Sequence, residues 1–263
     1  MTVCVRRALG KDIMHHGIYT DFYCKVLPLP DEGAADIAAA AEIMSGAYEY
    51  NIGRVVFAPS FHLGLPLHFR SMNAFLQLRG HRYRELRSKL PAWVNYCQAT
   101  DLIWHPGCFD YPELYRFCVG SSDHILFTLP FPFFDDAVWF DINKLIHHTR
   151  YRPIFTNYDN CLITYSATDL ESLERIPGAT FQFNVRSLAD KDVRRYVLKL
   201  LGSSVRVVFG TGNHRSECPG IEMEKYLAPL RKNMGDDDFF ALMHSIKSFC
   251  RPVRYRPRST SRH

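Results

Sequence analysis

Two spacings of apolar residues follow each other at the start of the chain. A β-rich run at 17–27 places side chains alternately on two faces and ends in prolines and a polar turn at 31–33, as a strand followed by a loop does. An alanine-rich segment at 34–50 predicts a helix, and Gly53 follows it as a helix-stop residue. A strand that leads into a helix through a polar turn is the βα unit of an α/β protein.

Similar units follow along the rest of the chain. Further helices are expected at 66–89, 137–149, 190–201 and 221–249, and buried strands at 54–58 and 93–104. Neither an internal repeat nor a linker interrupts this order, so we predict one α/β domain at 18–250. A weakly periodic extension at 1–17 precedes the domain, and a tail at 251–263 follows it.

The positive charge of the chain is concentrated in this tail. The net charge is +5, from 32 basic and 27 acidic residues, and five of the arginines lie in the tail, so the remainder balances at 27 against 27. A formally neutral domain is not expected to bind nucleic acid specifically. The tail is expected to be a disordered, solubilising end; the alternative is that it docks an acidic partner or an anionic membrane surface.

Sequence signals of membrane insertion, secretion and zinc binding by paired cysteines are missing. No apolar run reaches the roughly 18 residues of a membrane helix, and the first residues do not resemble a signal peptide, so a cytoplasmic location is expected. The eight cysteines include no C-x-x-C pair and are interpreted as reduced thiols rather than zinc ligands.

One stretch resembles a known family. Residues 20–34 read TDFYCKVLPLPDEGA, which is similar to the opening motif D-x-H-x-H-I-L-P-x-x-D-D-G-A of bacterial protein-tyrosine phosphatases of the polymerase and histidinol phosphatase (PHP) superfamily. The best match is to members found in capsule and exopolysaccharide operons. Segments at 124–133, 152–160, 181–188 and 205–214 resemble later motifs of the family in the same order. The resemblance implies a single distorted (β/α)7 TIM-like barrel, with its chemistry at the carboxyl ends of the strands.

Most positions that the resemblance aligns with the family's metal ligands carry other residues. Where the family has His, His, His, Glu, His, Asp and His, this chain has Tyr23, Lys25, Ser60, Asp101, Asn157, Gly212 and His214. Thr100 replaces Asp101 if the alignment slips by one residue, and His62 lies close enough to Ser60 in sequence to be recruited. Asp101, His214 and His62 are therefore the residual metal candidates.

These substitutions do not suit a cluster of divalent metals. Such a cluster activates a water molecule and orients the phosphate, and each ion needs several deprotonated ligands. The three residual candidates would hold at most one weak ion, and an ammonium at Lys25 would repel it. No cofactor is therefore expected, although an active enzyme would require a divalent metal such as manganese.

The exchanged residues suggest a site for an anion. Lys25 and Arg186 add positive charge, Gly212 replaces an acid, and backbone N–H groups at 210–212 can form a nest. The candidate anion-binding or substrate-binding residues are Lys25, Arg186, Asn157, Ser60, Gly212 and His214. The alternative is a neutral site packed shut, which Tyr23 and Phe61 favour.

Three functions follow in order of preference. The first is a tyrosine-phosphatase-like protein with little or no catalysis, binding an anion or phosphotyrosine and linked to capsular or exopolysaccharide biosynthesis through a phosphotyrosine protein or a bacterial tyrosine kinase. The second is an active, manganese-type protein-tyrosine phosphatase with an unusual ligand set. The third is a metal-free hydrolase with His214 as general base; its candidate nucleophiles, Ser60, Thr211 and Cys24, have no partner that the sequence identifies.

Overall fold

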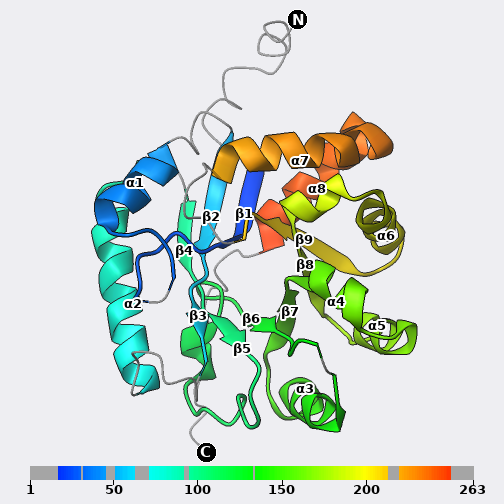
Figure 1. The fold of residues 1–263 in the computed structure, drawn as a ribbon, viewed down its shortest axis with the longest axis horizontal. Helices are drawn as coiled ribbons and strands as arrows, with labels where there is room; N and C mark the ends of the chain where they lie inside the picture. The colour runs from blue at the N-terminus through cyan, green and yellow to red at the C-terminus, as the bar shows by residue number, and fades with distance from the viewer. Residues whose placement is uncertain are drawn as a thin grey trace, which may run out of the picture.

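The computed structural model shows strands in the centre of the molecule and helices around them (Figure 1). It describes residues 17–30, 32–45, 51–62, 71–91, 95–132, 134–212 and 219–249, without the side chains of 219–222, 248 and 249. The tail, most of the N-terminal extension and His214 lie outside the described residues. No helix in the described ranges is long and apolar enough to cross a membrane.

The elements alternate as an α/β fold requires. The strands are β1 (Tyr19–Cys24), β2 (Ile52–Phe57), β3 (Ser60–Phe61), β4 (Asn95–Gln98), β5 (Asp101–Ile103), β6 (His124–Thr128), β7 (Arg152–Thr156), β8 (Thr180–Asn184) and β9 (Arg206–Gly210). The α-helices are α1 (Ile37–Ser45), α2 (Met72–Arg87), α3 (Asp136–His148), α4 (Tyr158–Thr164), α5 (Ala167–Glu174), α6 (Lys191–Leu201), α7 (Pro219–Met234) and α8 (Asp236–Phe249). Two 3-10 helices join them, η4 (Leu114–Phe117) and η5 (Val185–Ala189).

All strand pairs are parallel and form two sheets, β1-β2-β4 and β3-β5-β6-β7-β8-β9. The first and last strands also meet, through an isolated bridge between Cys24 and Gly212. There the Gly212 N–H donates to the Tyr23 carbonyl (2.9 Å), and the Lys25 N–H donates to the Gly212 carbonyl (3.3 Å). The end of β1 is thus held against the segment that follows β9.

The strand predicted at 93–104 is wrong as one element, because it breaks into β4 and β5. The neighbouring strand breaks at the same level: Phe57 pairs with Gln98 before the break, and Ser60 pairs with Asp101 after it. Pro59 lies in the break and has no N–H to donate to a ladder, but its carbonyl accepts the Asp101 N–H (3.0 Å). Two adjacent strands therefore share one interruption.

Helix boundaries differ modestly from the prediction. The first helix spans Ile37–Ser45 and the second Met72–Arg87, within the predicted 34–50 and 66–89. The region predicted as helical at 221–249 is two helices, α7 and α8, separated at Gly235, whose φ of 88° is the left-handed conformation that commonly ends a helix.

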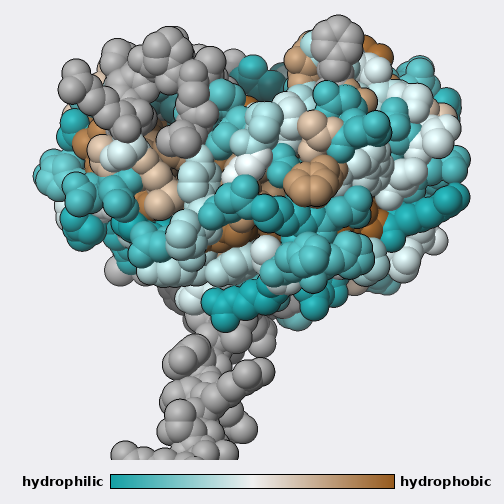
Figure 2. Space-filling model, turned by 90° about the horizontal axis from the view of Figure 1, so that it is seen from below, coloured by the Kyte–Doolittle hydropathy of each residue, from teal (hydrophilic) through white to brown (hydrophobic). Residues whose placement is uncertain are grey.

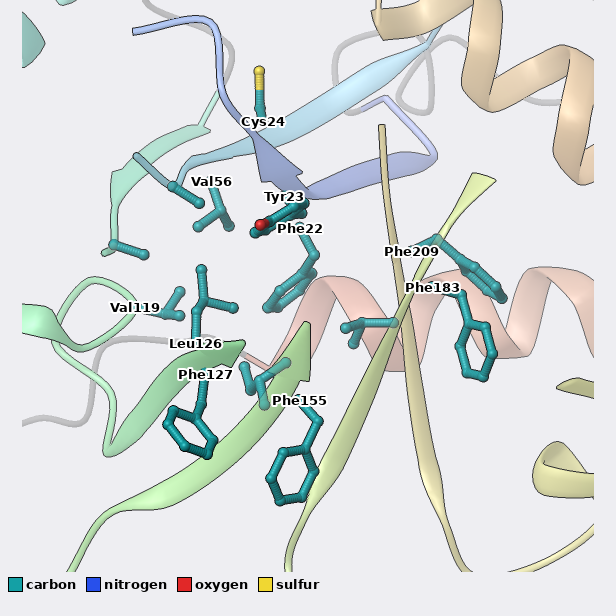
Figure 3. Packing of buried hydrophobic residues seen from close by; sticks show 14 of the residues in the cluster. Phe22, Tyr23, Cys24, Val56, Val119, Leu126, Phe127, Phe155, Phe183 and Phe209 are labelled. Carbon is teal, nitrogen blue, oxygen red and sulfur yellow. The ribbon is translucent and has the colours of Figure 1, made fainter. Parts of the chain in front are cut away.

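The interior faces of the strands are filled by side chains. Tyr23, Val56 and Leu126 point toward one another from β1, β2 and β6, whereas Phe127 and Phe155 point away from them (Figure 3). The last two rings pack together with 6.1 Å between their centroids, in the layer between strands and helices. The surface seen from below is largely hydrophilic, with scattered hydrophobic residues (Figure 2).

Contact between β9 and β1 predicts that Gly210→Ala destabilises the fold. An alanine Cβ at Gly210 would lie 2.4 Å from the Tyr23 Cβ and 2.7 Å from its backbone nitrogen. Overpacking of this kind costs about 1–3 kcal/mol, which urea unfolding would measure. Gly80→Ala on α2 is the matched control: its Cβ meets only the end of the Arg84 side chain at 3.5 Å, so it should stabilise the helix by about 0.5–1 kcal/mol. Wild-type stability of Gly210→Ala would contradict the contact.

Candidate functional site

The shared break in the strands brings the aligned ligand positions together. Ser60 and Asp101 begin β3 and β5 and are register partners. Thr128 and Thr156 end β6 and β7 and are also partners. Tyr23 lies at the end of β1, so the side chains meet at the carboxyl ends of β1, β6 and β7, where barrel-like α/β folds place their sites.

Asp101 is the centre of this cluster and is 1% exposed. Its Oδ1 lies 2.8 Å from the Thr128 hydroxyl and 2.9 Å from the Thr156 hydroxyl. Its Oδ2 accepts the Tyr23 hydroxyl at 2.5 Å and lies 3.3 Å from the Lys25 ammonium. A carboxylate offers about four lone-pair sites, so protein donors occupy the acceptor capacity of Asp101.

Lys25 is held by several groups in this cluster, and its side chain is 12% exposed. Its Nζ donates to the Ser60 hydroxyl (2.5 Å), lies 3.5 Å from Glu32 Oε2, and lies 4.8 Å from the centre of the Tyr23 ring. Burial opposes the charge on Lys25, but the contacts with Tyr23, Asp101 and Glu32 outweigh burial and raise its pKa. Lys25 is therefore an ammonium ion with two carboxylate partners.

Glu32 is a site residue that the sequence analysis missed. It was interpreted only as part of a polar turn, but its carboxylate contacts Lys25 and accepts the backbone N–H of Ser60. Lys25 thus faces two carboxylates, Glu32 and Asp101. These two carboxylates offset the charge of Lys25, and the sequence-based expectation of added positive charge did not count Glu32.

A chain of amides continues the cluster from Tyr23. Asn157 Nδ2 donates to the Tyr23 hydroxyl (3.0 Å), and Asn184 Nδ2 donates to Asn157 Oδ1 (3.0 Å). Asn184 Nδ2 also lies 3.2 Å from both carboxylate oxygens of Asp159. Asn157 adopts the left-handed conformation, with φ of 53°, which asparagine tolerates better than most residues. Burial and the charge of Asp101 both raise the pKa of Tyr23, so its phenol stays protonated.

Two of the three backbone N–H groups expected to form a nest, those of Thr211 and Gly212, have protein acceptors. The Thr211 N–H donates to Asp21 Oδ1 (3.0 Å), and the Gly212 N–H donates to the Tyr23 carbonyl. Burial raises the pKa of Asp21, and the hydrogen bonds from Thr211 and Tyr23 partly offset that effect. Gly212 has a φ of 82°, and a Cβ there would meet Asn184 Oδ1 at 2.8 Å. This position therefore favours glycine over the aspartate that the PHP-type motif has here.

Four other residues singled out from the sequence also lie within the described ranges. Arg186 is exposed on η5. The His62 ring lies 5.3 Å from that of His105. Thr100, the slipped alternative to Asp101, accepts a hydrogen bond from Arg79 instead. Phe61 is buried and packs on Phe75 at 4.9 Å.

The donor set does not fit a cluster of divalent metals. Among the described side chains, no group of three or more His, Cys, Asp or Glu residues can hold a metal ion. The one aligned carboxylate, Asp101, already contacts an ammonium and four hydroxyl groups, and a cation there would face the charge of Lys25. A divalent ion would have to displace Lys25 and reorganise these hydrogen bonds.

Lys25 and Ser60 also do not form a base–nucleophile pair. Their contact resembles one, but a general base must be able to lose its proton near the working pH. The raised pKa keeps Lys25 protonated, so it can donate to Ser60 but cannot accept the serine proton.

Comparisons with known proteins support the fold. No family model and no curated protein matches the sequence. Among solved structures, the chain is similar to one reported with YwqE from Bacillus subtilis and CpsB from Streptococcus pneumoniae, described as unique metal-dependent tyrosine phosphatases. The TM-score is 0.71 at 18% identity, over 90% of this chain and 96% of that one. N-acetylneuraminate lyase from Fusobacterium nucleatum matches with a TM-score of 0.39 and 12% identity, over 89% of this chain and 82% of that one, too low to support an argument.

Removing Lys25 should destabilise the protein strongly. Lys25→Met leaves Asp101 buried without its cation, and breaking a buried ion pair from one side costs about 3–5 kcal/mol. Tyr23→Phe removes one hydrogen bond to the same carboxylate and should cost about 1–3 kcal/mol. Urea unfolding measures both. The double variant Lys25→Met/Asp101→Asn should recover part of the lost unfolding free energy, because both substitutions act on the same ion pair. A loss of less than about 1 kcal/mol for Lys25→Met alone would contradict the ion pair.

Stability should also fall at alkaline pH. The pKa values of Lys25 and Tyr23 are both raised in the folded chain, so above about pH 10, where the unfolded groups lose protons, the folded state binds more protons. The free energy of unfolding then decreases as pH rises. Urea titrations from pH 8 to 11 should show a shallower decrease for Lys25→Met than for Lys232→Met, an exposed control on α7. Equal slopes would mean that Lys25 has no raised pKa.

Proposed function

We propose that this chain is a tyrosine-phosphatase-like protein of the PHP fold that has lost metal-dependent catalysis and acts by binding. The observation that carries the proposal is the Lys25 ammonium 3.3 Å from Asp101 Oδ2. An ion pair there supplies internally the positive charge that a divalent metal would supply from outside. The similarity to the YwqE and CpsB structures supports the fold, and the substituted ligand positions support the loss of catalysis.

The same proposal includes the (β/α)7 barrel. Counting β2 with β3 and β4 with β5 gives seven strand segments, because each pair is separated only by the shared break. The bridge between Cys24 and Gly212 supports closure of these segments between β9 and β1.

A regulatory role linked to capsular or exopolysaccharide biosynthesis remains part of the proposal. Its partner would be a phosphotyrosine protein or a bacterial tyrosine kinase. The alternative is an active manganese-type phosphatase, which would need ligands beyond those assembled around Asp101. Anion binding at Lys25, Ser60 and Asn157 would require Glu32 to release Lys25, because Glu32 and Asp101 already provide its counter-charge.

Calorimetric titration with manganese tests the loss of metal chemistry. We expect the wild-type protein to show no saturable manganese binding, and no hydrolysis of a phosphotyrosine peptide that manganese stimulates and a chelator abolishes. Lys25→His replaces the ammonium with a metal ligand and should bind manganese more tightly than the wild type. Lys25→Met, which removes the charge without adding a ligand, is the matched control.

Two outcomes would contradict the proposal. One is binding of two or more manganese equivalents by the wild-type protein. The other is chelator-sensitive turnover of the phosphotyrosine peptide, which would favour the active-phosphatase alternative.

A further inference from the structure

A polar cavity lies beside the strand break, where Arg79 of α2 contacts Ala99 and Thr100. It has a volume of about 500 Å³ and lies between β2, α2, β4 and the segment from η4 to Ser121. Three arginines line it, Arg54, Arg79 and Arg116, and no aspartate or glutamate is among its described lining residues. The cavity is therefore a concentration of positive charge within the size range of small-molecule sites, about 300–1,000 Å³.

Arg79 is a nearly buried cation in this cavity, at 9% exposure. Its Nη1 donates to the Ala99 carbonyl (3.2 Å) and the Thr100 hydroxyl, and its Nη2 donates to the Arg116 carbonyl (3.0 Å). Its Nε is buried and has no hydrogen-bond partner. All of these acceptors are neutral, and no ion pair to a carboxylate is found for Arg79 within the described residues.

The electrostatics of Arg79 agree with this geometry. Burial and the nearby charge of Arg116 together lower the pKa of the Arg79 guanidinium to about 10. Buried charges in proteins are normally paired, and removing or omitting the partner leaves a large desolvation cost. A ligand with negative charge would supply the missing partner.

The other two arginines add to the same charge. Arg54 is 7% exposed, and its Nη1 donates to the Lys247 carbonyl (2.6 Å), a further neutral acceptor. Arg116 is more accessible and pairs with Glu113 at 2.7 Å. Among the described residues, a carboxylate therefore pairs with only one of the three guanidinium groups, that of Arg116, so the cavity retains uncompensated positive charge.

We propose that this cavity binds a phosphate monoester through Arg79 and Arg116. Guanidinium groups bind phosphate oxygens through paired, charge-assisted hydrogen bonds. A dianion matches several cations better than a single carboxylate does. Tyr83, Tyr96 and Tyr115 also line the cavity and offer aromatic surface to the organic group of the ester.

A purely structural role for Arg79 is the competing explanation. Its Nη1 contacts fasten Ala99 and Thr100, the two residues of the break between β4 and β5. That role explains the position of Arg79 but does not explain why Arg54 and Arg116 line the same cavity. Arg116 is therefore the more informative position to change, because its side chain is 28% exposed and does not hold the break.

Calorimetric titration of the full chain with phenyl phosphate and with inorganic phosphate, in a sulfate-free buffer, tests the proposal. We expect saturable binding of phenyl phosphate at one equivalent, with inorganic phosphate weaker because it lacks the aromatic contact. Arg116→Gln and Arg79→Lys should each weaken binding about tenfold or more, since each removes a charge-assisted hydrogen bond or its paired geometry. Arg82→Gln, on the same helix but outside the lining, should bind as the wild type does.

The variants separate this cavity from the Asp101 cluster. Thermal unfolding followed by circular dichroism checks that each variant folds, and Arg116→Gln still tests the proposal if Arg79→Lys does not fold. Tyr23→Phe, which alters only the cluster, should keep wild-type binding. The proposal is overturned if the wild-type protein does not bind phenyl phosphate saturably, if Arg116→Gln binds as tightly as Arg82→Gln, or if Tyr23→Phe alone weakens binding.

Discussion

The buried contact between Lys25 and Asp101 constrains much of this structure. Asp101 accepts from Tyr23 of β1 and lies within hydrogen-bond distance of the threonine hydroxyls that end β6 and β7, so one carboxylate joins elements from distant parts of the chain. Such a carboxylate needs a nearby cation, since an unpaired buried charge is costly. Lys25 provides that charge, and a divalent ion at Asp101 would have to displace it. Structural stability and metal binding therefore compete for one side chain.

The break between β4 and β5 connects this cluster with the arginine cavity. Thr100 and Asp101 are adjacent in sequence and contact opposite partners: Thr100 accepts from Arg79 of α2, and Asp101 accepts from Tyr23 of β1. Neighbouring residues in an extended chain point to opposite sides. The break is therefore held on one side by the Arg79 guanidinium and on the other side by the hydrogen-bond donors around Asp101. A ligand bound to Arg79 would contact the side chain that holds Thr100, next to Asp101, without entering the Asp101 cluster.

Local signals in the sequence predicted the elements better than the contacts. The period-two run and the alanine-rich segment identified β1 and α1, and the alignment brought Tyr23, Lys25, Ser60, Asp101 and Asn157 into one site. Glu32 was interpreted as a turn residue because its role depends on Lys25 and Ser60 folding against it. Thr128 and Thr156 carried no local signal, since they reach Asp101 only when β5, β6 and β7 are adjacent. The division at 99–100 was missed for a similar reason: it follows from the break between β2 and β3, which pair with β4 and β5, not from a glycine or proline in that segment.

Anomalous diffraction from a crystal of the wild-type protein grown with manganese tests the central claim most directly. The account predicts that the Lys25 ammonium stays in contact with the Asp101 carboxylate, as in the structure described above, and that no anomalous peak appears beside Asp101. Two manganese peaks bridged by Asp101, with Lys25 turned away from it, would contradict the account.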